Sequence, residues 1–183
     1  MKILFLDFDG VLNTREFLTE LHTRKVNHTE NLRKDSQKGN VSGDSRWVDM
    51  VDPSKVALLN QIIEETNCLV VVSSSWRIQN TRQDLQSILD KRGFKGHILG
   101  KTGKRLSNHW RGNEIRWWLQ DWQNSGRENI SSFVILDDES DMLDLMPRLV
   151  QTSFDDEGLT QDHVDKAIQM LNENMDWSLF DLS

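Results

Sequence analysis

The chain has 183 residues, 37% of them hydrophobic and 28% charged, with a formal net charge of −7. This size and balance predict one globular domain over residues 1–183, and no apolar run approaches the ~20 residues of a membrane-spanning helix. A single cysteine, Cys68, excludes an internal disulfide, and acidic residues interrupt the first apolar stretch too early for a signal peptide. A cytoplasmic location is therefore expected.

The acidic excess is concentrated near the end of the sequence. Residues 137–183 contain 13 acidic and two basic side chains, so residues 1–136 contain 16 acidic and 20 basic ones. The net charge argues against a protein that coats nucleic acids in general, but the basic part of the chain is compatible with an anionic substrate. An acidic C-terminal helix that only aids solubility explains the asymmetry equally well.

Short apolar runs alternate with amphipathic stretches along the chain. The expected strands are residues 2–6, 69–72, 132–136 and 149–152. One expected helix begins at Pro53, and three others cover residues 84–92, 114–122 and 160–171. Continuous apolar strands between helices indicate an α/β fold, a Rossmann-like three-layer sandwich with a mainly parallel central sheet.

Two segments do not fit this alternation. Residues 14–52 are polar and include a basic cluster, so we interpret them as a small cap insertion after the first strand, with one helix over 15–23 followed by a loop. Residues 96–108 are glycine-rich and basic, and no strand is predicted there.

Polar residues follow three of the expected strands. Asp7 and Asp9 follow the first strand, Ser73 follows the second, and Asp137 and Asp138 follow the third. The carboxyl ends of parallel strands lie at one edge of a sheet, so these carboxylates should crowd together. A bound divalent cation relieves their repulsion, and a set of oxygen ligands without His or Cys favours Mg²⁺.

Magnesium beside carboxylates suggests phosphoryl transfer. Asp7 can act as a covalent nucleophile, and Asp9 can protonate the leaving oxygen and then activate water. Ser73 can donate a hydrogen bond to a phosphoryl oxygen or simply cap a following helix. Arg111, just before the 114–122 helix, is the candidate catalytic cation, and Lys104 and Arg105 are weaker ones.

A further group of residues is expected to contact the substrate. Gly10 allows a backbone turn tight enough to aim amides at a phosphate. For Arg77, binding of phosphate and pairing with an acid at the sheet edge are equally open. The candidate substrate-binding residues are Gly10, Asn13, Ser74, Arg77 and Lys104.

The seven tryptophans raise the possibility of base stacking. Trp117, Trp118 and Trp122 lie at helical spacing, so packing in the core explains at least two of them. Trp76 and Trp110 flank the expected site and are the better candidates for stacking on a base, against the simpler reading of core packing.

Three segments of the chain together carry a family resemblance. Residues 7–12 (DFDGVL) resemble motif I of the haloacid dehalogenase (HAD) superfamily, residues 70–73 (VVVS) its motif II, and residues 135–138 (ILDD) its motif IV. The longer strings at 73–77, 111–119 and 135–142 are similar to small HAD domains of phages and bacteria, some of them within multidomain RNA-repair proteins.

The resemblance implies a site in which Asp7 is the nucleophile and Asp9 the acid/base. It also implies Mg²⁺ held by Asp7, the carbonyl of Asp9, and either Asp137 or Asp138. The superfamily usually has a lysine as its motif III cation, where this sequence offers Arg111.

The resulting hypothesis is a magnesium-dependent phosphomonoesterase of the HAD type that acts through an aspartyl-phosphate. The expected substrate is a nucleotide or a nucleic-acid end, with a 3′-phosphatase-like activity and no membrane partner. The alternatives are a small-metabolite or mononucleotide phosphatase and, in another class, a non-catalytic domain that binds metal or phosphate for interaction.

Overall fold

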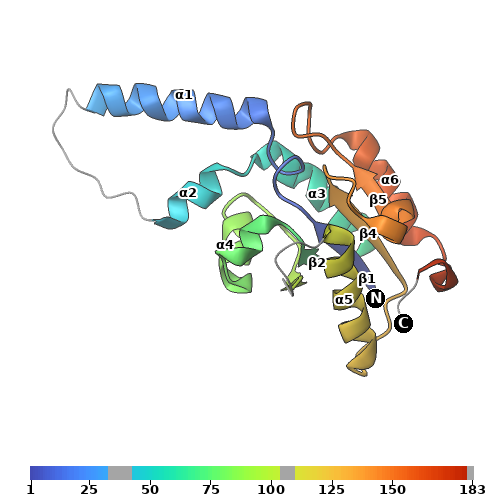
Figure 1. Ribbon diagram of the computed structural model, residues 1–183. Coiled ribbons are helices and arrows are strands. Elements are labelled where there is room, and N and C mark those ends of the chain that lie inside the picture. Colours follow the sequence, from blue (N-terminus) through green and yellow to red (C-terminus); the bar gives the residue numbers. More distant parts are fainter. Residues whose placement is uncertain (33–42, 104–109, 181–183) are drawn as a thin grey trace.

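A five-stranded sheet forms the centre of the computed structural model, which describes residues 1–32, 43–103 and 110–180. All neighbouring strands are parallel, in the order β3-β2-β1-β4-β5 (Figure 1). The strands are β1 Lys2–Leu6, β2 Leu69–Val72, β3 Ile98–Lys101, β4 Ser132–Asp137 and β5 Leu149–Gln151. The predicted α/β class is confirmed, and the sheet is entirely parallel.

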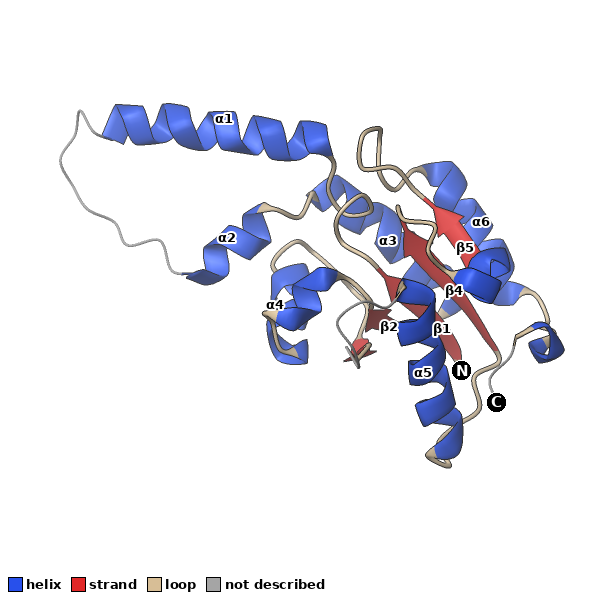
Figure 2. Ribbon diagram, viewed as in Figure 1, coloured by secondary structure: helices blue, strands red, loops and turns tan. Residues whose placement is uncertain are grey.

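Helices cover both faces of this sheet (Figure 2). The α-helices are α1 Arg15–Leu32, α2 Gly43–Asp49, α3 Pro53–Thr66, α4 Arg82–Asp90, α5 Arg111–Asn124 and α6 Gln161–Asn172. Three short 3₁₀ helices are η1 Ser75–Ile78, η2 Leu143–Arg148 and η3 Trp177–Leu179. Within the part of the chain that the structure describes, none of the helices is both long and apolar enough to span a bilayer.

The alternation of side chains along β1 creates two separate cores. Leu4 and Leu6 lie in a cluster with the buried faces of α3, α4 and α6. Ile3 and Phe5 lie in a second cluster with α5, η2 and the segment around Phe180. Side chains of a strand point alternately to opposite faces, so a single continuous apolar run supplies both cores. This arrangement gives the expected three layers.

Local signals explain where the helices begin and end. At α3, Pro53 occupies the first turn, Asp52 accepts a hydrogen bond from the Ser54 amide at 2.8 Å, and Asn67 ends the helix in a left-handed conformation. At α4, a reciprocal capping box between Thr81 and Asp84 starts the helix two residues before the predicted start.

Strand β3 was not predicted, because its segment has the composition of a glycine-rich loop. The strand is held by pairing with β2, in which Val71 lies opposite Gly100 and Val72 opposite Lys101. A short edge strand needs only one neighbour, and its own sequence carries little periodic signal.

The insertion between β1 and α3 contains more helix than the sequence predicted. Helix α1 continues to Leu32, nine residues beyond the expected end at residue 23, and α2 was not predicted. Figure 1 shows α1 extending past the body of the sheet, with α2 nearer to α4. Trp47 and Val48 of α2 and Met50, just after it, pack against the larger core cluster. The role of this insertion as a cap stays a prediction.

Candidate functional site

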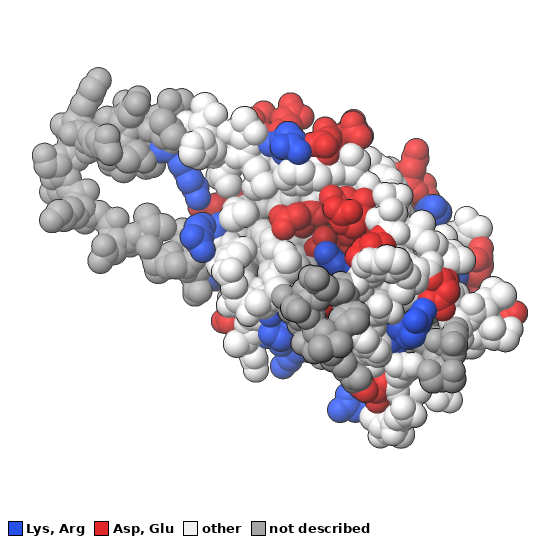
Figure 3. Space-filling view, in the orientation of Figure 1, with Lys and Arg blue, Asp and Glu red and all other residues white. Residues whose placement is uncertain are grey.

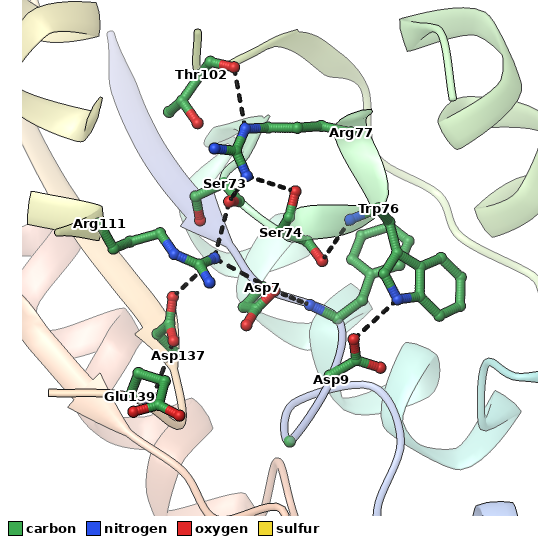
Figure 4. A network of polar contacts seen from close by, with 12 residues as sticks. Asp7, Asp9, Ser73, Ser74, Trp76, Arg77, Thr102, Arg111, Asp137 and Glu139 are labelled. Atoms are coloured by element: carbon green, nitrogen blue, oxygen red, sulfur yellow. Dashed lines mark hydrogen bonds and ion pairs between the residues drawn. The ribbon is translucent and has the colours of Figure 1, made fainter. Parts of the chain in front are cut away.

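The carboxyl ends of β2, β1 and β4 bring three predicted residues to one edge of the sheet. Leu6 of β1 lies opposite Val72 and Leu136, so the following residues, Asp7, Ser73 and Asp137, are neighbours. The ladder continues across this edge, since the Asp7 amide donates to the Leu136 carbonyl and the Ser73 amide to the Leu6 carbonyl, both at 2.9 Å. Figure 4 shows their side chains converging.

Three carboxylates form the acidic centre of the site. One oxygen from each of Asp7, Asp137 and Asp138 lies within 4.8 Å of the others. Asp7 is 4% exposed and Asp137 is fully buried. Burial and then the charge of Asp7 raise the pKa of Asp137 to about 8 and that of Asp138 to about 6. The crowding that the sequence predicted is therefore present.

This centre fits a hard divalent cation. All of its donors are carboxylate oxygens, the ligand type that Mg²⁺ and Ca²⁺ prefer. Oδ1 of Asp137 accepts the Glu139 amide at 3.1 Å, whereas its buried Oδ2 has no hydrogen-bond partner among the described residues. The nearest positive charge to this oxygen in the described part of the chain is Nη1 of Arg111, 3.3 Å away, which makes no hydrogen bond with it. A buried carboxylate oxygen that lacks a hydrogen bond is costly, and a bound cation would reduce that cost.

Arg111 supplies positive charge to the same place. Its Nη1 lies 3.4 Å from Asp7 Oδ1 and 3.3 Å from Asp137 Oδ2, and it donates to the Ser73 carbonyl at 2.7 Å. Burial alone would lower the pKa of Arg111, but these carboxylates outweigh it and raise the pKa above its ordinary value. The guanidinium is therefore a permanent cation at the sheet edge.

The first turn of α5 fixes where Arg111 lies. Arg111 is the first residue of this helix, and its amide donates to Asp141 Oδ2 at 2.8 Å. The Gly112 amide donates to the Asp141 carbonyl at 3.1 Å. Asp141 therefore caps α5 from the loop after β4, because the residue before the helix, Trp110, makes no side-chain cap.

The turn after β1 holds Asp9 and Gly10 in place. Asp9 Oδ2 accepts the indole N–H of Trp76 and Oδ1 accepts Asn13 Nδ2, each at 3.0 Å. Gly10 has φ +73°, and a Cβ there would lie 2.4 Å from Cγ of Asp138. Only glycine allows both this conformation and the close approach.

Two of the predicted substrate contacts, Asn13 and Ser74, make hydrogen bonds inside the protein. Asn13 is buried, accepts the Gly10 amide, and donates to Asp9 and to the Met50 carbonyl, so it shapes the turn. Ser74 is buried, and its hydroxyl accepts the Trp76 amide at the start of η1. The capping role that was open for Ser73 thus belongs to its neighbour.

Ser73 itself has a free hydroxyl. Its Oγ is buried and has no hydrogen-bond partner in residues 1–32, 43–103 and 110–180. An unpartnered hydroxyl beside Asp7 and Arg111 is available to a ligand oxygen.

Arg77 uses four of its five N–H donors inside the protein. It is 6% exposed, donates through Nε to the Thr102 carbonyl and through Nη1 to the carbonyls of Ser73 and Ser74, and pairs through Nη2 with Glu114. Two roles were open for Arg77, binding of phosphate and pairing with an acid, and in the structure it forms the ion pair with Glu114. The acid comes from α5, and its position in the first turn of a tryptophan-rich helix was the only signal for it in the sequence.

The two tryptophans proposed for base stacking differ in exposure. Trp76 is 4% exposed and packs against Phe8 and Trp47 with ring centroids 4.9 and 4.6 Å away, so the stacking prediction for it is wrong. Trp110 is 57% exposed and directly precedes Arg111. Trp118 and Trp122 pack against the smaller core cluster, as their spacing predicted.

An acidic patch lies on the surface near the candidate site. Acidic side chains gather near the middle of the face in Figure 3, around the region where β1 and β4 end in Figure 1. Lys104 and Arg105, the weaker candidate cations, lie outside the described residues, so their contact with the substrate stays a prediction.

Comparison with known proteins finds one family. The family model described as "HAD domain in Swiss Army Knife RNA repair proteins" matches residues 3–164. No curated protein and no solved structure matches the chain. The matched region includes the whole sheet except Lys2, the first residue of β1, and all residues of the acidic centre.

Proposed function

Because the chain belongs to the family of HAD domains in Swiss Army Knife RNA repair proteins, we propose that it is a magnesium-dependent phosphomonoesterase. The proposal rests above all on one observation: Asp7 and Asp137, at the carboxyl ends of parallel strands, both lie within 3.4 Å of Nη1 of Arg111. A nucleophile, a cation and a metal-binding carboxylate are the parts that phosphoryl transfer through an enzyme carboxylate requires.

In the first half of the reaction, an oxygen of Asp7 attacks the phosphorus of the ester. The new bond between that oxygen and phosphorus gives an aspartyl-phosphate, and the bond from phosphorus to the leaving oxygen breaks. Asp9 donates its proton to the leaving oxygen, so the alcohol departs neutral.

In the second half, water attacks the phosphorus of the aspartyl-phosphate. Asp9, now ionised, takes a proton from that water, and the bond between phosphorus and the Asp7 oxygen breaks. Inorganic phosphate leaves, and both aspartates return to their starting states.

The surrounding residues offset the negative charge of the transferred group. Arg111 presents its guanidinium beside Asp7, and the unpartnered hydroxyl of Ser73 is available to a phosphoryl oxygen. When bound, Mg²⁺ would supply further neutralisation of the phosphoryl oxygens, and the residues proposed to hold it are Asp7, Asp9 through its carbonyl, and Asp137 or Asp138.

We infer a nucleic-acid end as the substrate, in the sense of a 3′-phosphatase. The family description, which places these domains in RNA repair proteins, supports this choice, and so does the exposed ring of Trp110 beside Arg111. Turnover of a 3′-phosphorylated oligonucleotide should exceed that of the matching mononucleotide. Preference for the mononucleotide would favour the alternative of a small-molecule phosphatase.

Substitution of Asp7 tests the reaction itself. Asp7→Asn keeps the shape of the side chain but removes the nucleophilic charge, so magnesium-dependent hydrolysis of an aryl phosphate should fall by at least about 10³-fold. The matched control is Asp90→Asn on the exposed face of α4, which should retain wild-type turnover with the same circular dichroism spectrum.

Retained activity in Asp7→Asn would remove this residue as the nucleophile. A wild-type protein that binds beryllium fluoride, a mimic of the acyl-phosphate, without hydrolysing any phosphate ester would favour the non-catalytic alternative.

A further inference from the structure

The carboxylate of Asp9 is held by two side chains. Its Oδ2 accepts the indole N–H of Trp76 and its Oδ1 accepts the amide of Asn13, both at 3.0 Å. A carboxylate has about four acceptor positions, so each oxygen keeps capacity to bind or release a proton. These two bonds fix the direction of the group without occupying it completely.

The ring of Trp76 is itself fixed from several sides. It is almost fully buried, and its centroid lies 4.9 Å from that of Phe8 and 4.6 Å from that of Trp47. Its backbone amide donates to Ser74 at the start of η1. An indole has one donor, so the orientation of the ring determines where that N–H points. Figure 4 shows this donor directed at Asp9.

Trp76 and Asn13, which donate to the Asp9 carboxylate, also contact the insertion between β1 and α3. Trp47, which packs on Trp76, belongs to α2, and Asn13 donates to the carbonyl of Met50 just after that helix. The position of Asp9 thus depends on residues that follow β2 and on residues of the segment between β1 and α3.

We propose that Trp76 is a positioning residue that holds the carboxylate of Asp9 for proton transfer to the leaving oxygen, with Trp47 fixing the orientation of its ring. This role rests on the proposed function, in which Asp9 is the acid. A well-placed acid contributes about 10²–10⁴-fold, and a displacement of about 1 Å can cost 10²-fold. Loss of the indole N–H should therefore reduce the rates of the steps in which Asp9 transfers a proton, the first of which is departure of the leaving group.

The leaving group provides the test. Para-nitrophenolate departs readily without protonation, whereas phenolate, from an ester of nearly the same shape, needs the acid more. In Trp76→Phe, kcat/KM for phenyl phosphate should fall by about 10- to 100-fold, while kcat/KM for para-nitrophenyl phosphate should fall by less than about threefold. The ratio kcat/KM is the correct measure, because it reports the steps up to departure of the first product.

Trp122→Phe is the matched control. Trp122 also loses an indole hydrogen bond in this substitution, a donation of 2.9 Å to the Glu128 carbonyl, and it also stacks on another tryptophan. Trp122 lies at the far end of α5 from Arg111, so in Trp122→Phe the kcat/KM values for both esters should fall equally little. Trp47→Ala should reproduce the selective loss of phenyl phosphate turnover.

Equal losses on the two esters in Trp76→Phe, or unchanged turnover of phenyl phosphate, would overturn the positioning role while leaving the phosphatase intact. A wild-type protein inactive on both esters and on a 3′-phosphorylated oligonucleotide would overturn the proposed function, and this role with it.

A second measurement needs no turnover and does not depend on folding of the tryptophan variant. Of the indole N–H signals of the seven tryptophans in the NMR spectrum, Asp9→Ala should shift one strongly and speed its exchange with solvent. A spectrum in which no indole signal moves would show that the hydrogen bond is not made in solution, and would overturn the proposal.

Discussion

At the scale of single residues, the carboxylates of the site lie close both to each other and to a cation. Asp7 and Asp137 are buried within 3.4 Å of the guanidinium of Arg111, which among the described residues is the one cation that pairs with both of them. One positive charge offsets only part of the charge of three carboxylates. Burial, and after it the remaining negative charge of Asp7, raises the pKa values of Asp137 and Asp138.

Gly10 is the residue at which backbone conformation and the acidic centre meet. In Gly10→Ala the left-handed backbone costs about 1–2 kcal/mol, and the new Cβ would displace Asp138, whose Cγ lies 2.4 Å from that position. We expect both the free energy of unfolding in urea and the affinity for Mg²⁺, measured by calorimetry, to fall.

Gly126→Ala separates these two effects. Gly126 also has a positive φ, +70°, but a Cβ there would meet nothing within 4 Å. In Gly126→Ala, the left-handed backbone should likewise lower the free energy of unfolding in urea, while the affinity for Mg²⁺ should be unchanged. Equal affinity in both variants would contradict the link between Gly10 and Asp138.

At the scale of elements, the first turn of α5 is tied to the segment that follows β2. Arg111 and Glu114 lie one turn apart on α5, and they bond to the Ser73 carbonyl and to Arg77, respectively. Burial lowers the pKa of Arg77, while the charge of Glu114 opposes that change. The ion pair therefore joins two elements that each contribute a residue to the site.

Glu114→Gln should weaken this connection strongly. The variant leaves the buried guanidinium of Arg77 without a counter-charge, while the amide can still accept a hydrogen bond, so we expect a loss of about 2–4 kcal/mol in unfolding free energy. The control is Glu64→Gln, which breaks an exposed pair with Lys95 and should cost less than about 1 kcal/mol in the same denaturant titration. Similar small losses in both variants would contradict a structural role for the buried pair.

Gly112 sets how closely α5 approaches the loop after β4. In a helix, alanine is favoured over glycine by about 1 kcal/mol, but a Cβ at this position would lie 2.4 Å from the Met142 carbonyl oxygen. Backbone atoms cannot move aside as a side chain can, and overpacking typically costs about 1–3 kcal/mol. We therefore expect Gly112→Ala to lower the melting temperature and to reduce turnover through displacement of Arg111.

Gly100→Ala is the control for this substitution, since the nearest atom to its Cβ, Nε1 of Trp118, would lie at an ordinary 3.7 Å. A melting temperature for Gly112→Ala above that of the wild type would mean that helix propensity outweighs the contact with Met142.

At the scale of the whole molecule, stability and metal binding should depend on pH together. In the metal-free protein, the pKa of Asp137 is raised from 3.8 to about 8, so its contribution to stability is complete below pH 4 and is lost as the pH rises through about 8. Mg²⁺ competes with this proton. The increase in melting temperature on adding Mg²⁺ should therefore be larger near pH 8 than near pH 6.

Asp137→Asn provides the comparison, because it removes the group that titrates near pH 8. The pH dependence of the magnesium-induced shift should become much weaker in this variant. A shift in the wild-type protein that is the same at both pH values would contradict proton competition at the acidic centre.

The sequence by itself determined the class of the fold and the residues at the strand ends. Continuous apolar runs such as 2–6 and 132–136 specify buried parallel strands, because only strands covered on both faces tolerate them. The order of Asp7, Ser73 and Asp137 after three such runs was sufficient to predict that they meet, since the geometry of a parallel sheet places those ends together.

Only the tertiary structure decided what the neighbouring polar residues do. Asn13, Ser74 and Arg77 have the side chains of ligand contacts, yet each is buried and bonded within the protein. Trp76 similarly became a buried donor to Asp9. A hydrogen-bonding side chain carries no local record of its partner: the partner of Arg77 is 37 residues away, and that of Trp76 is 67 residues away. Their roles follow from packing between distant segments, which periodicity and spacing do not encode.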